Sequence, residues 1–279
     1  MITEKDVLYG TGGDRDLRLD IYRPEKKAHN HTAVLLLHGG AWRFGDKSMM
    51  EIFGSELAGH GFVVLAPEYR LLGQAPWPAQ IEDVKTSILW TKAQAASLDI
   101  DPEKVVVQGF SAGGHLALMA GGTPDSSEFK GKGNGNISDC VAAAVAFFPA
   151  IEFTIDTPRP GMIRASKLLG ESPSEEAARK ASPIHYVSRK FPPTFLLHGT
   201  ADDRISCLSS QRMFDALHEK GVMTELHLYP SHTHEFARLP SMVAPTQAEI
   251  ALFLKRAVVE PEKYIRENQE LNMFAKTAP

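Results

Sequence analysis

The sequence predicts an α/β fold in which a mostly parallel central sheet is flanked by helices on both faces. Short apolar runs such as 33–40 and 104–110 show no alternation with polar residues, which is typical of strands covered on both faces. Longer amphipathic stretches separate these runs. A chain that repeats the order strand, helix, strand builds a parallel sheet through right-handed crossovers. Both observations therefore indicate the same architecture.

Each expected strand is rich in apolar or β-branched residues and is followed by turn-forming residues. These strands are 33–40, 62–69, 104–110, 140–149, 194–200 and 225–230. Ahead of them, the segments "DVLY" and "LRLDIYRP" are suited to antiparallel strands added at one edge of the sheet. The sheet is therefore expected to be mixed only at that edge.

The expected helices are the amphipathic stretches between and after these strands. They are 48–60, 79–97, 112–121, 207–220 and 245–258. Within the second stretch, Ile81, Val84 and Ile88 repeat with the period of an α-helix, so their side chains are expected to face the sheet.

Three further segments complete a single domain that is expected to span residues 1–279. Residues 123–139 are polar and glycine-rich and predict an exposed loop. Residues 152–192 contain several prolines and predict a small cap-like insertion over the sheet after the sixth strand. The tail, 261–279, is polar with scattered apolar residues, and it leaves open a last helix, a subunit contact or partial disorder.

Composition and charge exclude several classes of protein. The net charge is −4, from 30 basic and 34 acidic residues, and no basic run suggests nucleic-acid binding. The longest apolar stretch, 141–151, is too short to cross a membrane, and the first ten residues lack a secretion signal. Cys140 and Cys207 form no CxxC motif, so neither a disulfide framework nor a zinc site is indicated. We expect a cytoplasmic protein without metal, membrane or nucleic-acid partners; homo-oligomerisation stays open.

A serine lies where a predicted strand meets a predicted helix, within the pattern Gly109-Phe110-Ser111-Ala112-Gly113. A reversal this sharp would force Ser111 into a strained backbone conformation and expose its hydroxyl above the sheet, with glycine avoiding collisions on either side. The alternative is a serine at the start of a helix in a nucleotide-binding turn. The serine is thus either reactive or merely part of the turn.

A reactive serine needs amide donors for the oxyanion that develops on its substrate. Gly39 and Gly40 follow the strand 33–40, and without side chains their amides can approach a substrate closely. Together with the amide of Ala112 they would form an oxyanion hole. The alternative is a tight glycine turn after the strand, which would not explain why the glycines precede Trp42.

A reactive serine also needs a base and an acid that orients the base. Asp202 or Asp203, just beyond the strand 194–200, is suited to the acid. The base is His232 or His234, just after the last strand. A metal site on the two histidines is a weaker alternative, because no cysteine or carboxylate cluster joins them.

Jointly, these motifs resemble the α/β-hydrolase superfamily, and within it the hormone-sensitive-lipase-like and feruloyl/acetylxylan-esterase-like carboxylesterases. The matching segments follow the order of that family along the chain. They are "HGGAW" (38–42), "EYRL" (68–71), "WPAQIEDV" (77–84), "GFSAGGHLA" (109–117), "SPIHYV" (182–187), "PPTFLLHGTADD" (192–203) and "HEF" (234–236).

The resemblance implies an α/β-hydrolase fold and a serine carboxylesterase for small soluble esters, with no cofactor. It implies Ser111 as the nucleophile, which forms an acyl-enzyme. It assigns the acid to Asp202, since the acid in this family stands four residues after a histidine that matches His198. It assigns the base to His234, two residues before Phe236. At "SHTHEF" the family commonly has a single histidine followed by Gly-Phe, so the second histidine is a departure.

Two alternatives to an esterase remain on the same resemblance. Arylformamidases, which act on N-formylkynurenine, share the His-Gly-Gly-x-Trp motif and the triad. A non-catalytic binding protein on the same fold normally lacks a member of the triad.

Aromatic residues near the motifs are candidates for an apolar substrate pocket, although each is equally suited to the core. They are Trp42, Phe44, Trp77, Phe110 and Phe148.

Overall fold

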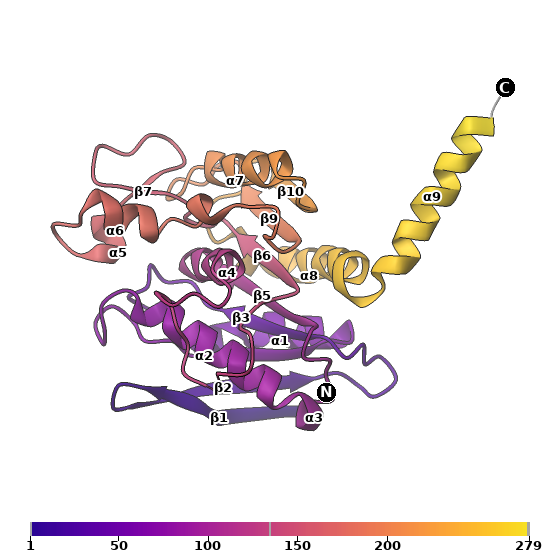
Figure 1. Ribbon diagram of the computed structural model, residues 1–279, viewed down its shortest axis with the longest axis horizontal. Helices are drawn as coiled ribbons and strands as arrows, with labels where there is room; N and C mark the ends of the chain where they lie inside the picture. Colours follow the sequence, from indigo (N-terminus) through magenta and orange to yellow (C-terminus); the bar gives the residue numbers. More distant parts are fainter. Residues whose placement is uncertain (1, 134, 278–279) are drawn as a thin grey trace.

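A computed structural model describes residues 2–133 and 135–277, and in them an eight-stranded sheet forms the centre of the fold (Figure 1). Its strand order is β1-β2-β4-β3-β5-β6-β9-β10. The strands are β1 (Ile2–Gly12), β2 (Arg15–Arg23), β3 (Ala33–Leu37), β4 (Val63–Pro67), β5 (Val105–Phe110), β6 (Ala143–Phe147), β9 (Thr194–Gly199) and β10 (Thr224–Tyr229). β1 pairs antiparallel with β2 and β2 with β4, whereas the other pairs are parallel. The predicted α/β class and the antiparallel edge are confirmed.

Helices cover both faces of this sheet. They are α1 (Glu51–Gly59), α2 (Ala79–Ala93), α3 (Ala95–Leu98), α4 (Ala112–Gly122), α7 (Leu208–Glu219) and α8 (Pro240–Leu254). Short helical turns also occur at η1 (Lys47–Met50), η3 (Phe236–Arg238) and the π-helical η4 (Lys255–Val259).

Successive residues of a central strand pack against the helices on opposite faces of the sheet. In β3, Leu35 packs in the same buried cluster as residues of α2 and α4, while Val34 packs in the cluster that contains residues of α1 and α8. All five residues of β3 are buried, which agrees with its unbroken apolar sequence. The loops at the carboxyl ends of the strands therefore emerge from a close-packed sheet.

The predicted insertion lies between β6 and β9. It contains β7 (Phe153–Thr154), β8 (Ile163–Arg164), α5 (Ser166–Leu169), α6 (Glu175–Lys180) and η2 (Pro183–Tyr186). The tail forms a helix, α9 (Pro261–Thr277), which extends away from the body of the protein (Figure 1). In the part of the chain that the structure describes, no helix is both long and apolar enough to cross a membrane.

The loop 123–139 is less exposed than the sequence predicts. Phe129 and Asp139 are buried. Phe129 packs against Trp77, and Asp139 forms an ion pair with the buried ammonium group of Lys85. Lys85 Nζ lies 3.0 and 3.2 Å from the two carboxylate oxygens of Asp139. The prediction of an exposed loop is wrong at these residues, since a pair 54 positions apart leaves no local pattern in the sequence.

Candidate active site

Ser111 lies at the carboxyl end of β5, where the chain reverses into α4. Its backbone angles are φ 53° and ψ −112°, a conformation that costs a non-glycine residue about 1–3 kcal/mol. Two hydrogen bonds hold the residue there. Its N–H donates to Phe147 O in β6 at 2.9 Å, and its carbonyl accepts the N–H of His115 at 2.9 Å. The sheet and the helix together thus enforce the strained turn.

The glycines around Ser111 are required by close backbone contacts. A Cβ atom at Gly109 would lie 2.0 Å from the Gly113 carbonyl oxygen, and one at Gly113 would lie 2.3 Å from Leu37 O. Real Cβ atoms do not approach this closely. The strand, the turn and the helix can therefore meet only because these positions carry no side chain.

The structure brings Ser111, His234 and Asp202 into one hydrogen-bonded chain. His234 Nε2 lies 2.8 Å from Ser111 Oγ, and His234 Nδ1 lies 2.6 Å from Asp202 Oδ2. An ionised carboxylate only accepts hydrogen bonds, so Nδ1–H donates to Asp202 and Nε2 is left to accept the serine proton. This arrangement has the geometry needed to activate a hydroxyl.

Asp202 is enclosed by hydrogen-bond donors, and its side chain is fully buried. Oδ1 accepts the N–H groups of Arg204 and Ile205, both at 2.9 Å, and Oδ2 lies 3.1 Å from His198 Nε2 as well as close to His234. Burial by itself would raise the pKa of the Asp202 carboxyl. Hydrogen bonds from the two imidazoles and a peptide N–H outweigh burial and hold that pKa well below its ordinary value.

The alternative acid and base lie elsewhere. Asp203 is exposed, whereas Asp202 is not. His232 Nδ1 faces Pro230 O at 2.9 Å, and its ring packs against Phe236, with centroids 5.4 Å apart. Of the residues that the sequence left open, the structure joins Asp202 and His234 to Ser111.

The three predicted amide donors belong to the two segments that adjoin Ser111, the loop after β3 and the start of α4. A Cβ atom at Gly39 would be 3.4 Å from Ser111 Cβ, so this loop passes directly beside the serine. Gly40 has φ 118°, and a Cβ there would lie 2.1 Å from Phe44 O. Ala112 is the first residue of α4, where peptide N–H groups have no acceptor within the helix.

Trp42 connects this glycine loop to the insertion through His115. Trp42 has φ 60°, and its Nε1–H donates to His115 Nδ1 at 3.2 Å. His115 Nε2–H in turn lies 2.8 Å from the carbonyl oxygen of Ala181, which it donates to. His115 is fully buried and makes no contact with Ser111 through its ring, in agreement with the expectation that it is structural.

The burial of His115 makes stability depend on pH. Burial lowers its pKa from 6.5 to about 4. Between these values the unfolded chain binds a proton that the folded protein does not, so the free energy of unfolding falls as the pH falls. The loss from this one group is about 2 kcal/mol at pH 5.

We expect His115→Gln to reduce this acid sensitivity. Urea unfolding of both proteins at pH 7.5 and pH 5 measures it, because all other titrating groups are shared and cancel in the comparison. The wild type should lose more stability than the variant between the two values. Equal losses would show that His115 is protonated as readily in the folded protein as in the unfolded chain.

A cavity of about 660 Å³ opens beside Ser111 and His234. Its walls are mainly apolar with a few charged groups at the side. The residues that line it are Gly40, Ala41, Trp42, Phe44, Gly45, Met49, Ser111, Ile163, Lys167, Arg204, Ile205, His234 and Glu235. Concave apolar sites with a few convergent polar groups are typical of small-molecule binding.

The predicted pocket residues are only partly placed on this wall. Trp42 and Phe44 line the cavity, but the other three do not. Phe110 is buried and stacks on Phe147, because the last residue of β5 points toward α1. Trp77 lies against Phe129 in a separate hollow. These pocket predictions are corrected.

Phe148 has a different position from the one predicted. It is 2% exposed, and its ring lies 4.5 Å from the ring of His234, centroid to centroid. Its backbone has φ 37°, another left-handed conformation at a non-glycine residue. Phe148 therefore supports the imidazole from behind instead of lining the cavity.

Sequence reasoning missed several residues of the wall, among them Arg204, Glu235, Ile163 and Lys167. Arg204 and Glu235 adjoin the predicted acid and base in the sequence, and this adjacency was the signal that could have found them. Ile163 and Lys167 come from the insertion, where no motif marks them. Their position follows only from how the insertion folds over the sheet.

Comparison with known proteins gives consistent matches. A family model named BD-FAE matches residues 19–217. Among curated proteins, the probable carboxylic ester hydrolase LipM of Mycobacterium tuberculosis is 32% identical over 77% of this chain and 51% of its own length. Esterase LipC of the same organism is 30% identical over 91% of this chain and 65% of its own. The chain spans about half to two thirds of the length of these curated relatives.

A solved structure matches nearly the whole chain. Esterase 2 of the planctomycete Thermogutta terrifontis, with propionate bound, superposes with a TM-score of 0.77 at 27% identity. The match covers 90% of this chain and 93% of that one. Further structures of the same esterase contain butyrate or are phosphonylated by cyclosarin. The sheet and its flanking helices therefore have a counterpart among esterases.

Proposed function

Because this chain belongs to the BD-FAE family of α/β-hydrolase carboxylesterases, we propose that it is a serine carboxylesterase that hydrolyses small soluble esters with short acyl chains. The observation that carries the proposal is the hydrogen-bonded chain from Ser111 through His234 to Asp202. The relative that binds propionate and butyrate supports the choice of short acyl groups.

In the first half of the reaction, His234 Nε2 accepts the hydroxyl proton as Ser111 Oγ attacks the ester carbonyl carbon. The negative charge that develops on the carbonyl oxygen is stabilised by the N–H groups of Gly39, Gly40 and Ala112. The C–O bond to the alcohol then breaks. The imidazolium returns its proton to the leaving alcohol, and the acyl group stays on Ser111.

In the second half, water repeats the attack on the acyl-enzyme. His234 takes a proton from the water, and the same amides stabilise the oxyanion. The bond between Ser111 Oγ and the acyl carbon then breaks to release the carboxylic acid, and the imidazolium returns its proton to Ser111 Oγ. Asp202 stays ionised throughout because its pKa lies far below neutral. Its charge stabilises the imidazolium in both halves.

The form of the cavity favours short acyl groups. The insertion contributes only Ile163 and Lys167 to the wall, and Phe44 on the other side is 70% exposed. A long acyl chain would extend past these residues into water. Each methylene group that meets no apolar wall gains none of the about 0.8 kcal/mol that burial supplies.

We expect kcat/KM on p-nitrophenyl esters to be highest between acetyl and butyryl and to fall for longer chains. The measurement is a series of rates from acetate to palmitate at one pH. The Ser111→Ala protein gives the background for each ester. A maximum at decanoyl or longer would contradict the short-chain proposal and leave the ester hydrolase itself intact.

Rates on a second substrate distinguish an esterase from an arylformamidase. N-formylkynurenine carries a formamide in place of the ester, and a formamidase should prefer it to p-nitrophenyl acetate. If kcat/KM is higher for the formamide, the proposed substrate class is wrong. If neither substrate reacts and a fluorophosphonate probe fails to label Ser111, the chain is a non-catalytic binding protein.

A further inference from the structure

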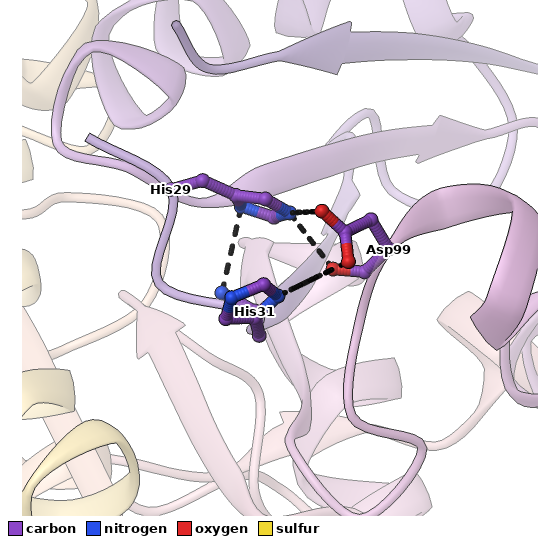
Figure 2. Close-up of side chains that lie close together, drawn as sticks. All are labelled: His29, His31 and Asp99. Atoms are coloured by element: carbon purple, nitrogen blue, oxygen red, sulfur yellow. Dashed lines mark hydrogen bonds and ion pairs between the residues drawn. The ribbon is translucent and has the colours of Figure 1, made fainter. Parts of the chain in front are cut away.

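Two histidines and a carboxylate lie together near the amino end of β3, whereas the catalytic cavity lies at the carboxyl ends of the strands. His29 and His31 are in the segment between β2 and β3, just before β3 begins, whereas the active-site glycines follow the end of β3. Asp99 ends α3. Figure 2 shows the three side chains converging from these two segments, which are 68 to 70 residues apart in the sequence.

The distances within this cluster are short. His29 Nε2 lies 3.3 Å from Asp99 Oδ2, and His31 Nδ1 lies 3.3 Å from Asp99 Oδ1. The same two nitrogens also lie 2.8 and 2.9 Å from the main-chain oxygen of Asp99. One donor atom from each of the three side chains can be chosen so that all lie within 4.8 Å of one another.

The backbone holds these groups in place. Asp99 has φ 56° and ψ 45°, a left-handed conformation that aspartate tolerates better than most residues. The N–H of Asp101 donates to His31 O at 2.8 Å and ties the two segments together. The His29 side chain is 13% exposed and that of Asp99 72%, so the cluster has one supported side and one open to solvent.

Tetrahedral zinc coordination matches the observed spacing. Bonds of about 2.0–2.1 Å place neighbouring donor atoms about 3.3 Å apart. Each imidazole nitrogen lies 3.3 Å from one oxygen of Asp99, His29 Nε2 from Oδ2 and His31 Nδ1 from Oδ1. The exposed carboxylate would turn slightly to present one oxygen to a metal between the two rings. Two imidazoles and a carboxylate suit zinc, whereas Mg²⁺ and Ca²⁺ prefer oxygen ligands. We propose that His29 Nε2, His31 Nδ1 and an Asp99 carboxylate oxygen bind Zn²⁺, with the Asp99 main-chain oxygen, which both nitrogens already face, in the fourth position.

Binding requires neutral rings whose coordinating nitrogens carry no proton. The N–H groups that now face the Asp99 carbonyl are replaced by the metal, and each ring keeps its proton on its other nitrogen. His29 Nδ1 now accepts the N–H of His31 over 3.4 Å, a long contact that is given up. The metal would join the segment before β3 to the end of α3 and so stabilise the fold without taking part in catalysis.

Isothermal titration of the full, untagged chain with ZnCl₂ at pH 7.5 tests this site. The wild type should bind one zinc ion, and MgCl₂ should give no binding. His31→Ala and Asp99→Asn should each weaken zinc binding at least about tenfold, since even outer-shell partners of a metal contribute that much. His218→Ala, which removes an exposed histidine on α7, is the matched control and should bind as the wild type does.

Two further readouts keep the test decisive. Zinc should raise the melting temperature of the wild type but not of His31→Ala, and rates on p-nitrophenyl acetate should be the same in both because His31 is far from Ser111. Absence of zinc binding by the wild type would overturn the proposal. So would unchanged binding in His31→Ala, or binding that is lost instead in His234→Ala.

Discussion

Replacing Ser111 with alanine should lower kcat on p-nitrophenyl acetate by about 10⁴–10⁶-fold, since removal of a nucleophile that acts with a base leaves only the oxyanion donors and substrate binding. The hydroxyl is 2.8 Å from His234 Nε2, and the described chain brings no other serine into that contact. The variant should also fail to react with a fluorophosphonate probe. Rates and labelling are measured on the same preparation.

The control for this experiment is Ser97→Ala. Ser97 is an exposed serine on α3, remote from the cavity, and its loss should leave both the rate and the labelling unchanged. A Ser111→Ala protein that melts like the wild type and still turns over ester at the normal rate would remove the proposed mechanism.

Replacing His234 with alanine should cost about as much as the loss of Ser111, about 10⁴–10⁶-fold in kcat, because nucleophile and base act as one unit. His232→Ala is the matched comparison, two residues away. Its ring faces Pro230 O and Phe236, so its removal should change kcat by no more than a few fold. Steady-state rates at pH 8 measure both variants.

The double variant gives a further check on the pair. If Ser111 and His234 act as a unit, the variant that lacks both should be little slower than either single variant. Multiplicative losses would mean that the two residues act independently. If His232→Ala were the inactive protein, the family resemblance would have misplaced the base.

Local patterns in the sequence were sufficient to predict the sheet and the turn at Ser111. The unbroken apolar strands and the glycines on either side of the serine can be recognised from short stretches of sequence. The convergence of Ser111, Asp202 and His234 depends on contacts between residues that are far apart in the sequence. Residues alone left two acids and two bases open, and the choice came from the resemblance to a known family.

The lining of the cavity was harder to predict, because it depends on side-chain direction at the ends of strands. Phe110 is the last residue of β5, Phe148 comes directly after β6, and the two side chains are chemically alike. Both belong to one buried cluster, with ring centroids 6.4 Å apart, yet Phe110 packs against Phe53 of α1 whereas Phe148 packs against His234. Neither composition nor periodicity distinguishes these outcomes. The buried pair of Lys85 and Asp139 and the cluster at His29 were missed for a related reason, since their partners are distant in sequence.

The backbone at Ser111 bears on how this protein evolves. Glycine adopts φ 53°, ψ −112° more readily than serine does, and the difference is about 1–3 kcal/mol of folding free energy. Ala41, Trp42 and Phe148 also have positive φ close by. A lineage screened only for robust folding would therefore drift toward glycine at position 111. The proposed hydrolase would therefore have to keep serine at this position at a cost in folding stability.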